Sequence, residues 1–157
     1  MKTPDIELAV ANYFDPRRNI IVPNVSWGFR GMHECDIFVL TSSGYAYEVE
    51  IKVSKSDLRK DKFKKHGHKS KYLKRLYFAV PEAMADMVDD IPERAGILSV
   101  SDKTDWKGYN RIELVREPAS ASKPYKFSIS ERLDILRLST LRVWSLKKKI
   151  NKIKNET

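Results

Sequence analysis

Two stretches of the chain carry the residue pattern of β-strands, residues 34–40 and residues 45–52, with the small polar cluster 41–44 between them. Runs rich in β-branched and aromatic residues, split by a short polar cluster that ends in glycine, predict two strands joined by a hairpin. Alternation in the second strand assigns Tyr45, Tyr47, Val49 and Ile51 to one face and Ala46, Glu48, Glu50 and Lys52 to the other. The first face is core, whereas the second places two carboxylates and an ammonium in a segment otherwise suited to burial.

The turn between these strands fixes which residues face one another, because a slip of one residue would send every side chain to the other face of the sheet. A three-residue loop with Gly44 in the left-handed conformation makes Thr41 and Tyr45 the closing pair. Counting back from that pair sets Asp36 opposite Glu50. Like charges on directly opposed residues are destabilising. The arrangement therefore requires a cation, either the ammonium of the nearby lysine or a divalent metal held by oxygen ligands.

The segments before the hairpin predict a helix and an edge strand. Thr3 suits the N-cap position of a helix over residues 4–14, which carries a stripe of apolar residues and ends at Asp15 before a proline. Residues 19–27 predict a strand. Because proline cannot donate to a central hydrogen-bond ladder, Pro23 places this strand at an edge of the sheet or divides it into two short pieces.

The segments after the hairpin alternate between helix and strand. Leu58 and Phe63 anchor a predicted helix, which a bend at residues 66–68 separates from a second short helix through Tyr72. The continuous apolar run at residues 76–80 then predicts a fully buried central strand.

A second strand of this kind is expected at residues 96–100, after a helix over residues 82–89. A succession of strand, helix and strand requires parallel pairing within one sheet. Imperfect alternation over residues 109–117 allows one more strand on the outside. We therefore expect a mixed sheet of about five strands with helices on both faces.

The C-terminal part of the chain has a different pattern. Residues 118–124 have the composition of a linker, and Ser130 suits the N-cap of a long helix over residues 131–154 with an apolar stripe and basic last turns. Such a helix would cover the sheet of its own chain or pack in a homodimer, and the pattern leaves both open. We expect a core over residues 1–117 and a linker with an amphipathic basic helix over residues 118–157.

The composition indicates a single globular domain. A chain of 157 residues is long enough for one hydrophobic core, and 41% hydrophobic with 32% charged residues is a globular composition. No apolar stretch approaches the roughly 18 residues that span a bilayer, and no signal-peptide pattern is present, so we expect a cytoplasmic protein without membrane contact. The single cysteine, Cys35, permits no intrachain disulfide and is expected to be a small core residue.

The positive charge is concentrated in one segment. Residues 52–75 contain eleven Lys or Arg and two acidic residues, a local charge of +9 that equals the formal net charge of the whole chain. A basic segment of this size beside a carboxylate cluster attracts a polyanion and releases its counterions. Without that cluster, a solvated lysine-rich helix would be the default interpretation.

Asp36, followed fourteen positions later by Glu50-Ile51-Lys52 on the next predicted strand, resembles the motif of the PD-(D/E)XK nuclease superfamily. Three runs are similar to the MmcB-type branch, which is associated with DNA repair: Val49–Ser54, Asp57–Asp61 and Arg75–Pro81. The resemblance covers roughly residues 5–100. Cys35 precedes the aspartate where the motif has proline, a position that the superfamily varies freely.

The resemblance implies a restriction-endonuclease-like sheet flanked by helices and a metal-dependent nuclease that acts on DNA. It implies that Asp36, Glu50 and the carbonyl of Ile51 hold Mg²⁺ or Mn²⁺, which stabilises charge on the scissile phosphate and lowers the pKa of a bound water. Lys52 would position or deprotonate that water, or neutralise the transition state. Glu7 would reach the metal site from the first helix, or be an ordinary acidic residue in a first helical turn.

The basic segment supplies the expected contacts to DNA: Lys55, Arg59, Lys60, Lys62, Lys64, Lys65, Lys69 and Tyr72. His66 and His68 are expected to contact phosphate or lie on plain surface and not to bind a metal, because a third ligand would have to converge on them. Arg30 and His33 are expected near the entrance of the site, each in a surface role. Glu48 is either a further member of the site or a residue at the exposed end of its face.

The triplet of acidic residue, any residue and lysine is weak by itself, because a chain rich in both types contains others by chance. Asp105-Trp106-Lys107, in a polar connection, is one of these. The rival structural interpretation is a partly exposed strand with a solvated charged face. Two rival functions also remain, a catalytically silent nucleic-acid-binding module and an assembly protein that acts through its C-terminal helix.

Overall fold

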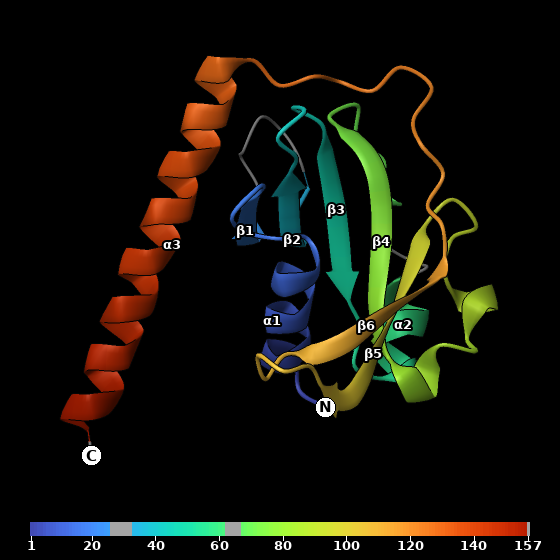
Figure 1. Ribbon diagram of the computed structural model, residues 1–157, viewed down its shortest axis with the longest axis horizontal. Coiled ribbons are helices and arrows are strands. Elements are labelled where there is room, and N and C mark those ends of the chain that lie inside the picture. Colours follow the sequence, from blue (N-terminus) through green and yellow to red (C-terminus); the bar gives the residue numbers. More distant parts are fainter. Residues whose placement is uncertain (26–32, 62–66, 157) are drawn as a thin grey trace.

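The computed structural model describes residues 1–25, 33–61 and 67–156. Its centre is a mixed six-stranded sheet in which the strands lie in chain order (Figure 1). The strands are β1 (Ile20–Val25), β2 (Cys35–Leu40), β3 (Ala46–Ile51), β4 (Leu73–Pro81), β5 (Gly96–Thr104) and β6 (Asn110–Arg116). β3, β4 and β5 pair in parallel, and the other neighbours pair antiparallel. The predicted mixed α/β fold is confirmed, with the outer strand as the sixth.

The predicted hairpin register is confirmed. The Thr41 amide donates to the Tyr45 carbonyl at 2.9 Å, and Gly44 has a φ of +89°, the left-handed conformation that the loop requires. Leu40 therefore pairs with Ala46, and the ladder continues to the pair of Ile37 and Val49. Because of this register, Asp36 and Glu50 come next at the same end of the two strands.

Helix α1 (Thr3–Tyr13) covers one face of the sheet. Its buried residues Ile6, Ala9 and Val10 pack on the aliphatic residues of the central strands, including Val49 and Ile51 of β3. At its N-terminus, Asp5 accepts a hydrogen bond from the Lys2 amide at 2.8 Å. The N-cap is therefore Lys2, and the predicted cap Thr3 is already the first helical residue.

The opposite face of the sheet carries two separate apolar clusters. One includes Phe38 of β2 and Phe127, and the other includes Leu58 of helix α2 (Lys55–Asp61) and Phe78 of β4. On β3 this face has one apolar residue, Ala46, and then carries the buried carboxylates described below. The fold thus positions charged residues in the interior of the molecule.

The C-terminal helix α3 (Ile129–Asn155) starts against the sheet and continues past β1 (Figure 1). Ser128 is its N-cap and forms a capping box with Glu131, so the predicted cap at Ser130 was two residues too late. Phe127 and Ile135 belong to the core cluster of β1 and β2. Across the described residues, no helix combines the length and apolar character needed to cross a membrane.

Two predicted helices are wrong. Residues 82–89 form two short 3₁₀ turns, Glu82–Met84 and Val88–Asp90, which bury Met84 without a continuous helix. Between Gly67 and Tyr72 the chain forms turns and no helix. Left-handed backbone at Gly67 and His68, with φ of +51° and +55°, forms a turn where a bend was predicted, and only four residues separate His68 from β4, which begins at Leu73.

Candidate functional site

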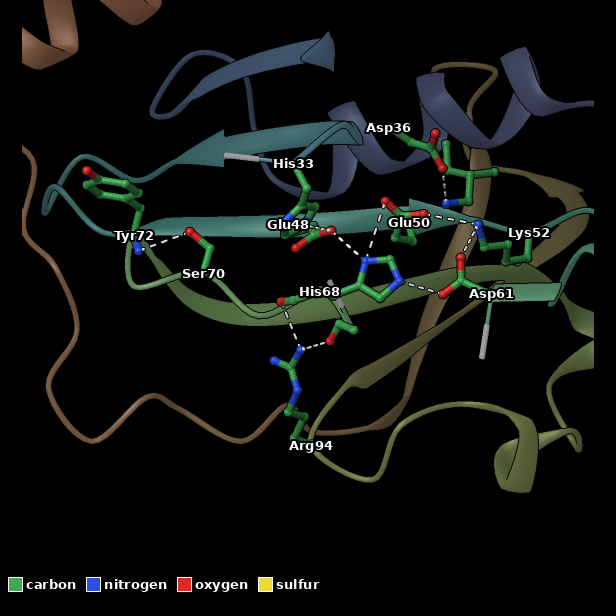
Figure 2. A network of polar contacts seen from close by, with 12 residues as sticks. His33, Asp36, Glu48, Glu50, Lys52, Asp61, His68, Ser70, Tyr72 and Arg94 are labelled. Atoms are coloured by element: carbon green, nitrogen blue, oxygen red, sulfur yellow. Dashed lines mark hydrogen bonds and ion pairs between the residues drawn. The ribbon is translucent and has the colours of Figure 1, made fainter. Parts of the chain in front are cut away.

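A buried polar cluster lies on the face of β3 opposite α1 (Figure 2). Alternation along β3 directs Glu48 and Glu50 to this face, and Lys52 follows directly after the strand. Their exposed fractions are 0%, 1% and 5%. Two histidines from outside the strands join them, His33 at 4% and His68 at 2% exposure. Groups of this polarity are retained in an interior only when they are paired with one another or with a ligand.

Lys52 links two of the carboxylates. Its Nζ lies 3.0 Å from Glu50 Oε2 and 2.8 Å from Asp61 Oδ1. Burial by itself would lower the pKa of Lys52, but the charges and hydrogen bonds of Glu50 and Asp61 outweigh burial and raise the pKa above its usual value. Lys52 is therefore a permanent cation at neutral pH.

Glu48 lies between the two histidines. Its Oε1 is 2.8 Å from His33 Nε2 and 2.8 Å from His68 Nδ1. Burial alone would raise the pKa of Glu48, but the hydrogen bonds from both imidazoles lower it overall, so the side chain is a carboxylate. Its other oxygen, Oε2, is buried and receives no hydrogen bond from the described residues.

His68 connects Glu48 and His33 to the group formed by Lys52, Glu50 and Asp61. Its Nδ1 contacts Glu48, and its Nε2 lies 2.5 Å from Asp61 Oδ2. Burial opposes the charged form, yet the bonds to Asp61 and Glu48 raise the pKa of His68 to about 9. At neutral pH His68 is therefore an imidazolium that bridges the carboxylates of Glu48 and Asp61.

The turn that carries His68 is held from outside. Arg94 Nη2 donates to the carbonyls of Gly67 and His68 at 2.8 and 2.9 Å. Left-handed backbone at a residue other than glycine is uncommon and persists where the surroundings enforce it. Arg94 and the buried contacts of the imidazole supply that enforcement, so His68 is held facing the sheet.

Asp36 lies at the end of β2, where its Oδ2 accepts a hydrogen bond from the Ile51 amide at 2.7 Å. Two groups of residues bring possible metal-ligand atoms within 4.8 Å of one another, His33 with Glu48 and His68, and Glu50 with Asp61 and His68. Asp36 belongs to neither group. Glu50 and Lys52 of the sequence motif are thus members of the cluster, whereas Asp36 lies outside both groups of ligand atoms, and these groups include two histidines.

An open groove adjoins the cluster at His68. Its volume is ≈ 420 Å³, and its wall includes Lys69, Lys71, Lys74, Arg75 and Arg94, which we call the basic groove. Residues 119–121 also line this groove. Because His68 belongs to both, the buried cluster and the positively charged surface are adjacent.

Several predicted site residues lie elsewhere. Glu7 lines a groove with β1 and α3, and burial raises its pKa. It belongs to neither group of convergent ligand atoms, so the structure does not bring it to the cluster. Tyr72 is half-buried and packs on Tyr125 and Phe127, so it does not line the basic groove. On α2, the predicted DNA contacts are exposed: Lys55, Arg59 and Lys60.

The surface roles predicted for two histidines are wrong. His33 and His68 are both buried in the cluster, because the carboxylates of Glu48 and Asp61 offer them charged partners. Glu48 is a central member of the site and not the exposed end of a face. Six residues named from the sequence lie outside the described residues: Arg30, Lys62, Phe63, Lys64, Lys65 and His66.

The sequence did contain a signal for Asp61. It follows Leu58 by three positions, which places both on one face of a helix, and Leu58 is fully buried. An acidic residue on the buried face of a lysine-rich helix needs a buried partner, and Lys52 is that partner. For His68 we find no such local signal, since its burial depends on the left-handed turn.

No protein-family model matches this chain, and no curated protein sequence matches it. The structure is similar to that of a protein of unknown function from Silicibacter pomeroyi, with a TM-score of 0.60. The two chains are 18% identical, and the likeness covers 95% of this chain and 90% of the other. At this identity the comparison shows a shared fold and carries no conclusion about activity.

Proposed function

We propose that the chain is a metal-dependent nuclease that hydrolyses phosphodiester bonds in DNA. The observation that supports this most is the position of Lys52, which lies between Glu50 and Asp61 immediately after β3, in a cluster that adjoins an open basic groove at His68. Phosphodiester hydrolysis needs carboxylates for a metal, a cation for the developing charge and a surface for the flanking phosphates. In this chain the buried carboxylates, Lys52 and the basic groove would meet these three requirements in turn.

The donor set fits a hard dication. Three buried carboxylates, those of Glu48, Glu50 and Asp61, face one lysine, so negative charge is in excess within the cluster even with His68 protonated. Carboxylate and carbonyl oxygens are the ligands that Mg²⁺ and Mn²⁺ take in proteins. Asp36 and Glu50, with the carbonyl of Ile51, would hold the ion, which when bound supplies charge stabilisation and a water of lowered pKa.

The charge of Lys52 narrows its role. Because Glu50 and Asp61 raise the pKa of Lys52, the protonated amine is favoured, and we assign it the role of a hydrogen-bond donor in preference to that of a general base. It acts as a hydrogen-bond donor that orients the attacking water or the phosphate, and it stabilises charge on the phosphorane-like transition state. Asp61 and Glu50 hold the ammonium in place for this task.

Cleavage of DNA in the presence of Mn²⁺ or Mg²⁺ tests the proposal. Lys52→Met should reduce cleavage at least about 100-fold, because the loss of one charge-stabilising donor in an active site costs that much. The matched control is Lys107→Met, which removes the lysine of the other acidic-x-Lys triplet on an exposed turn between β5 and β6. Equal activity of wild type and Lys52→Met would refute the proposal.

The burial of the cluster favours a second candidate, a catalytically silent nucleic-acid-binding module with this fold. Glu50 and Lys52 are almost closed to solvent, whereas the basic groove is open. This candidate predicts DNA binding that survives EDTA and Lys52→Met, with no cleavage under any metal. The same assay, run with a binding measurement, separates the two.

A further inference from the structure

We propose that His33, Glu48 and His68 form a buried centre for a transition-metal dication of the Zn²⁺ class, with ligands different from Asp36, Glu50 and Ile51 of the proposed nuclease site, although Glu50 Oε1 lies 3.8 Å from His68 Nδ1. The inference does not depend on nuclease activity. Its ligands would be two imidazole nitrogens and one carboxylate, each almost fully buried on the inner side of the sheet.

The three side chains already converge. His33 Nε2 and His68 Nδ1 each lie 2.8 Å from the same oxygen of Glu48, and their rings are nearly perpendicular, at 82°. Atoms bound about 2.1 Å from one ion at tetrahedral angles lie about 3.4 Å apart. The distance from each histidine nitrogen to Glu48 Oε1 would need to increase by roughly 0.6 Å to admit the ion. A small rotation of the side chains would be enough for this increase.

The carboxylate of Glu48 is incompletely paired without an ion. Both histidines direct their nitrogens at Oε1, while Oε2 is buried and has no hydrogen-bond partner among the described residues. Buried carboxylate oxygens are almost always paired. An ion between the imidazoles and the carboxylate would neutralise the negative charge of Glu48. It would also accept lone pairs of the carboxylate that the hydrogen bonds leave unsatisfied.

The surroundings of His68 match those of a metal ligand. Nδ1 is directed at the centre and would release its proton to solvent when an ion binds. Nε2 donates to Asp61 at 2.5 Å, and Asp61 lies 2.8 Å from Lys52 Nζ. Metal-binding histidines usually donate their second ring nitrogen to a carboxylate, which fixes the tautomer and the ring orientation. Asp61 provides that contact, and Arg94 fixes the turn on which His68 lies.

The donor types select the metal. Imidazole nitrogens suit Zn²⁺, Co²⁺ and related ions, whereas Mg²⁺ and Ca²⁺ prefer oxygen ligands. Two histidines and one carboxylate are a ligand set of tetrahedral zinc sites that keep a fourth position for water. The centre therefore prefers a different class of metal ion from a site built on Asp36 and Glu50.

The ligands come from three parts of the chain that are distant from one another in the sequence. His33 precedes β2, Glu48 is in the middle of β3, and His68 lies in the turn before β4. An ion shared by them would tie these segments together, and its binding free energy would add to the stability of the fold. The centre would also hold His68 beside the basic groove.

Cobalt binding to the full chain tests this inference. After chelation and removal of metals, we expect one Co²⁺ per chain with the intense visible absorption of a tetrahedral site. Zn²⁺ should displace it, and Mg²⁺ in large excess should not. Zn²⁺ should also raise the melting temperature.

Glu48→Gln should weaken Co²⁺ binding about 100-fold or more and remove the response of the melting temperature to Zn²⁺. Its matched control is Glu50→Gln, two residues along the same face, which should keep Co²⁺ affinity while abolishing the proposed cleavage. His33→Gln gives a second test if Glu48→Gln does not fold.

Two outcomes would overturn the inference. The first is stoichiometric Co²⁺ binding that survives both Glu48→Gln and His33→Gln. The second is binding lost in Glu50→Gln and retained in Glu48→Gln, which would place the ion in the other group of ligands. Cobalt binding without DNA cleavage would leave this centre intact and refute only the proposed nuclease.

Discussion

Single residues differ in how much of the site depends on them. Asp36 and Asp61 are both aspartates beside the motif, yet Asp36 accepts a backbone amide whereas Asp61 pairs with a lysine and a histidine. A neutral side chain with the same shape can replace the first contact, because an amide oxygen also accepts a hydrogen bond. Asparagine cannot replace the contacts of Asp61, because Lys52 and His68 would each lose one buried anionic partner.

Asp36→Asn should therefore change the free energy of unfolding by less than about 1 kcal/mol in EDTA, since the Ile51 amide keeps an acceptor. Asp61→Asn should cost about 3 to 5 kcal/mol, the usual effect of removing one partner from a buried ion pair. Urea unfolding of both variants measures this. If Asp36→Asn is the more damaging change, Asp36 is a structural residue and the proposed role in metal binding is wrong.

Gly67 permits a test of the turn before His68. Gly67 and Gly108 both have left-handed backbone, with φ of +51° and +86°, and a Cβ at either position would meet no atom within 4 Å. Alanine at each should cost about 1 to 2 kcal/mol through backbone strain alone.

Gly67→Ala should in addition weaken Co²⁺ binding, because it displaces His68, whereas Gly108→Ala in the turn before β6 should not. Thermal unfolding and cobalt titration of both variants check this pair. Equal cobalt affinity in the two variants would show that the turn at Gly67 does not position His68.

At the scale of elements, the sequence predicts what local rules decide. The hairpin of β2 and β3 follows from strand alternation and a glycine turn, so its register and the inward direction of Glu48 and Glu50 were predictable. The histidine contacts were not, because His33 and His68 meet Glu48 across 15 and 20 positions of sequence. Long-range pairing of this kind depends on the tertiary fold and leaves no periodic trace.

Helix α3 combines a core-forming start with an exposed end. Ile135 is buried, whereas an apolar stripe at seven-residue spacing lies exposed beyond it: Val143, Leu146, Ile150 and Ile153. Basic residues flank this stripe on both sides: Arg142, Lys147, Lys149 and Lys154. In a coiled coil these flanking positions face the partner helix, so pairing two copies would oppose like charges.

Deletion of residues 141–157 should accordingly leave the core intact, with a melting temperature within about 4 °C of wild type, because Phe127 and Ile135 remain. Both forms should sediment as monomers at low salt. A truncation at residue 125 would remove those core residues and is not equivalent. A dimer of the full chain at low salt that the deletion dissolves would contradict this charge argument and support assembly through α3.

The chain has a formal net charge of +9, and two of the positive surfaces in the described part of the chain lie apart from each other. The basic groove lies beside the buried cluster, whereas the lysines at the end of α3 lie on a helix that extends away from the sheet. A polyanion would be attracted to both, since the long-range field depends on the summed charge. Of these two surfaces, the basic groove is the one that adjoins the buried cluster, through His68.

The salt dependence of DNA binding separates these surfaces. Replacing Lys69, Lys71 and Lys74 together by Gln, and separately replacing Lys147, Lys148 and Lys149 by Gln, removes the same charge from the two places. Each phosphate contact contributes about −0.9 to the slope of log affinity against log salt on duplex DNA. If the groove is the docking surface, its variant should lose up to about 2.7 from the magnitude of that slope, similarly for all sequences, because phosphate contacts carry no base specificity. The α3 variant should then change the slope by less than about 0.9. A larger change for the α3 variant than for the groove variant would assign DNA docking to α3. That result would remove the electrostatic support for the proposed nuclease site.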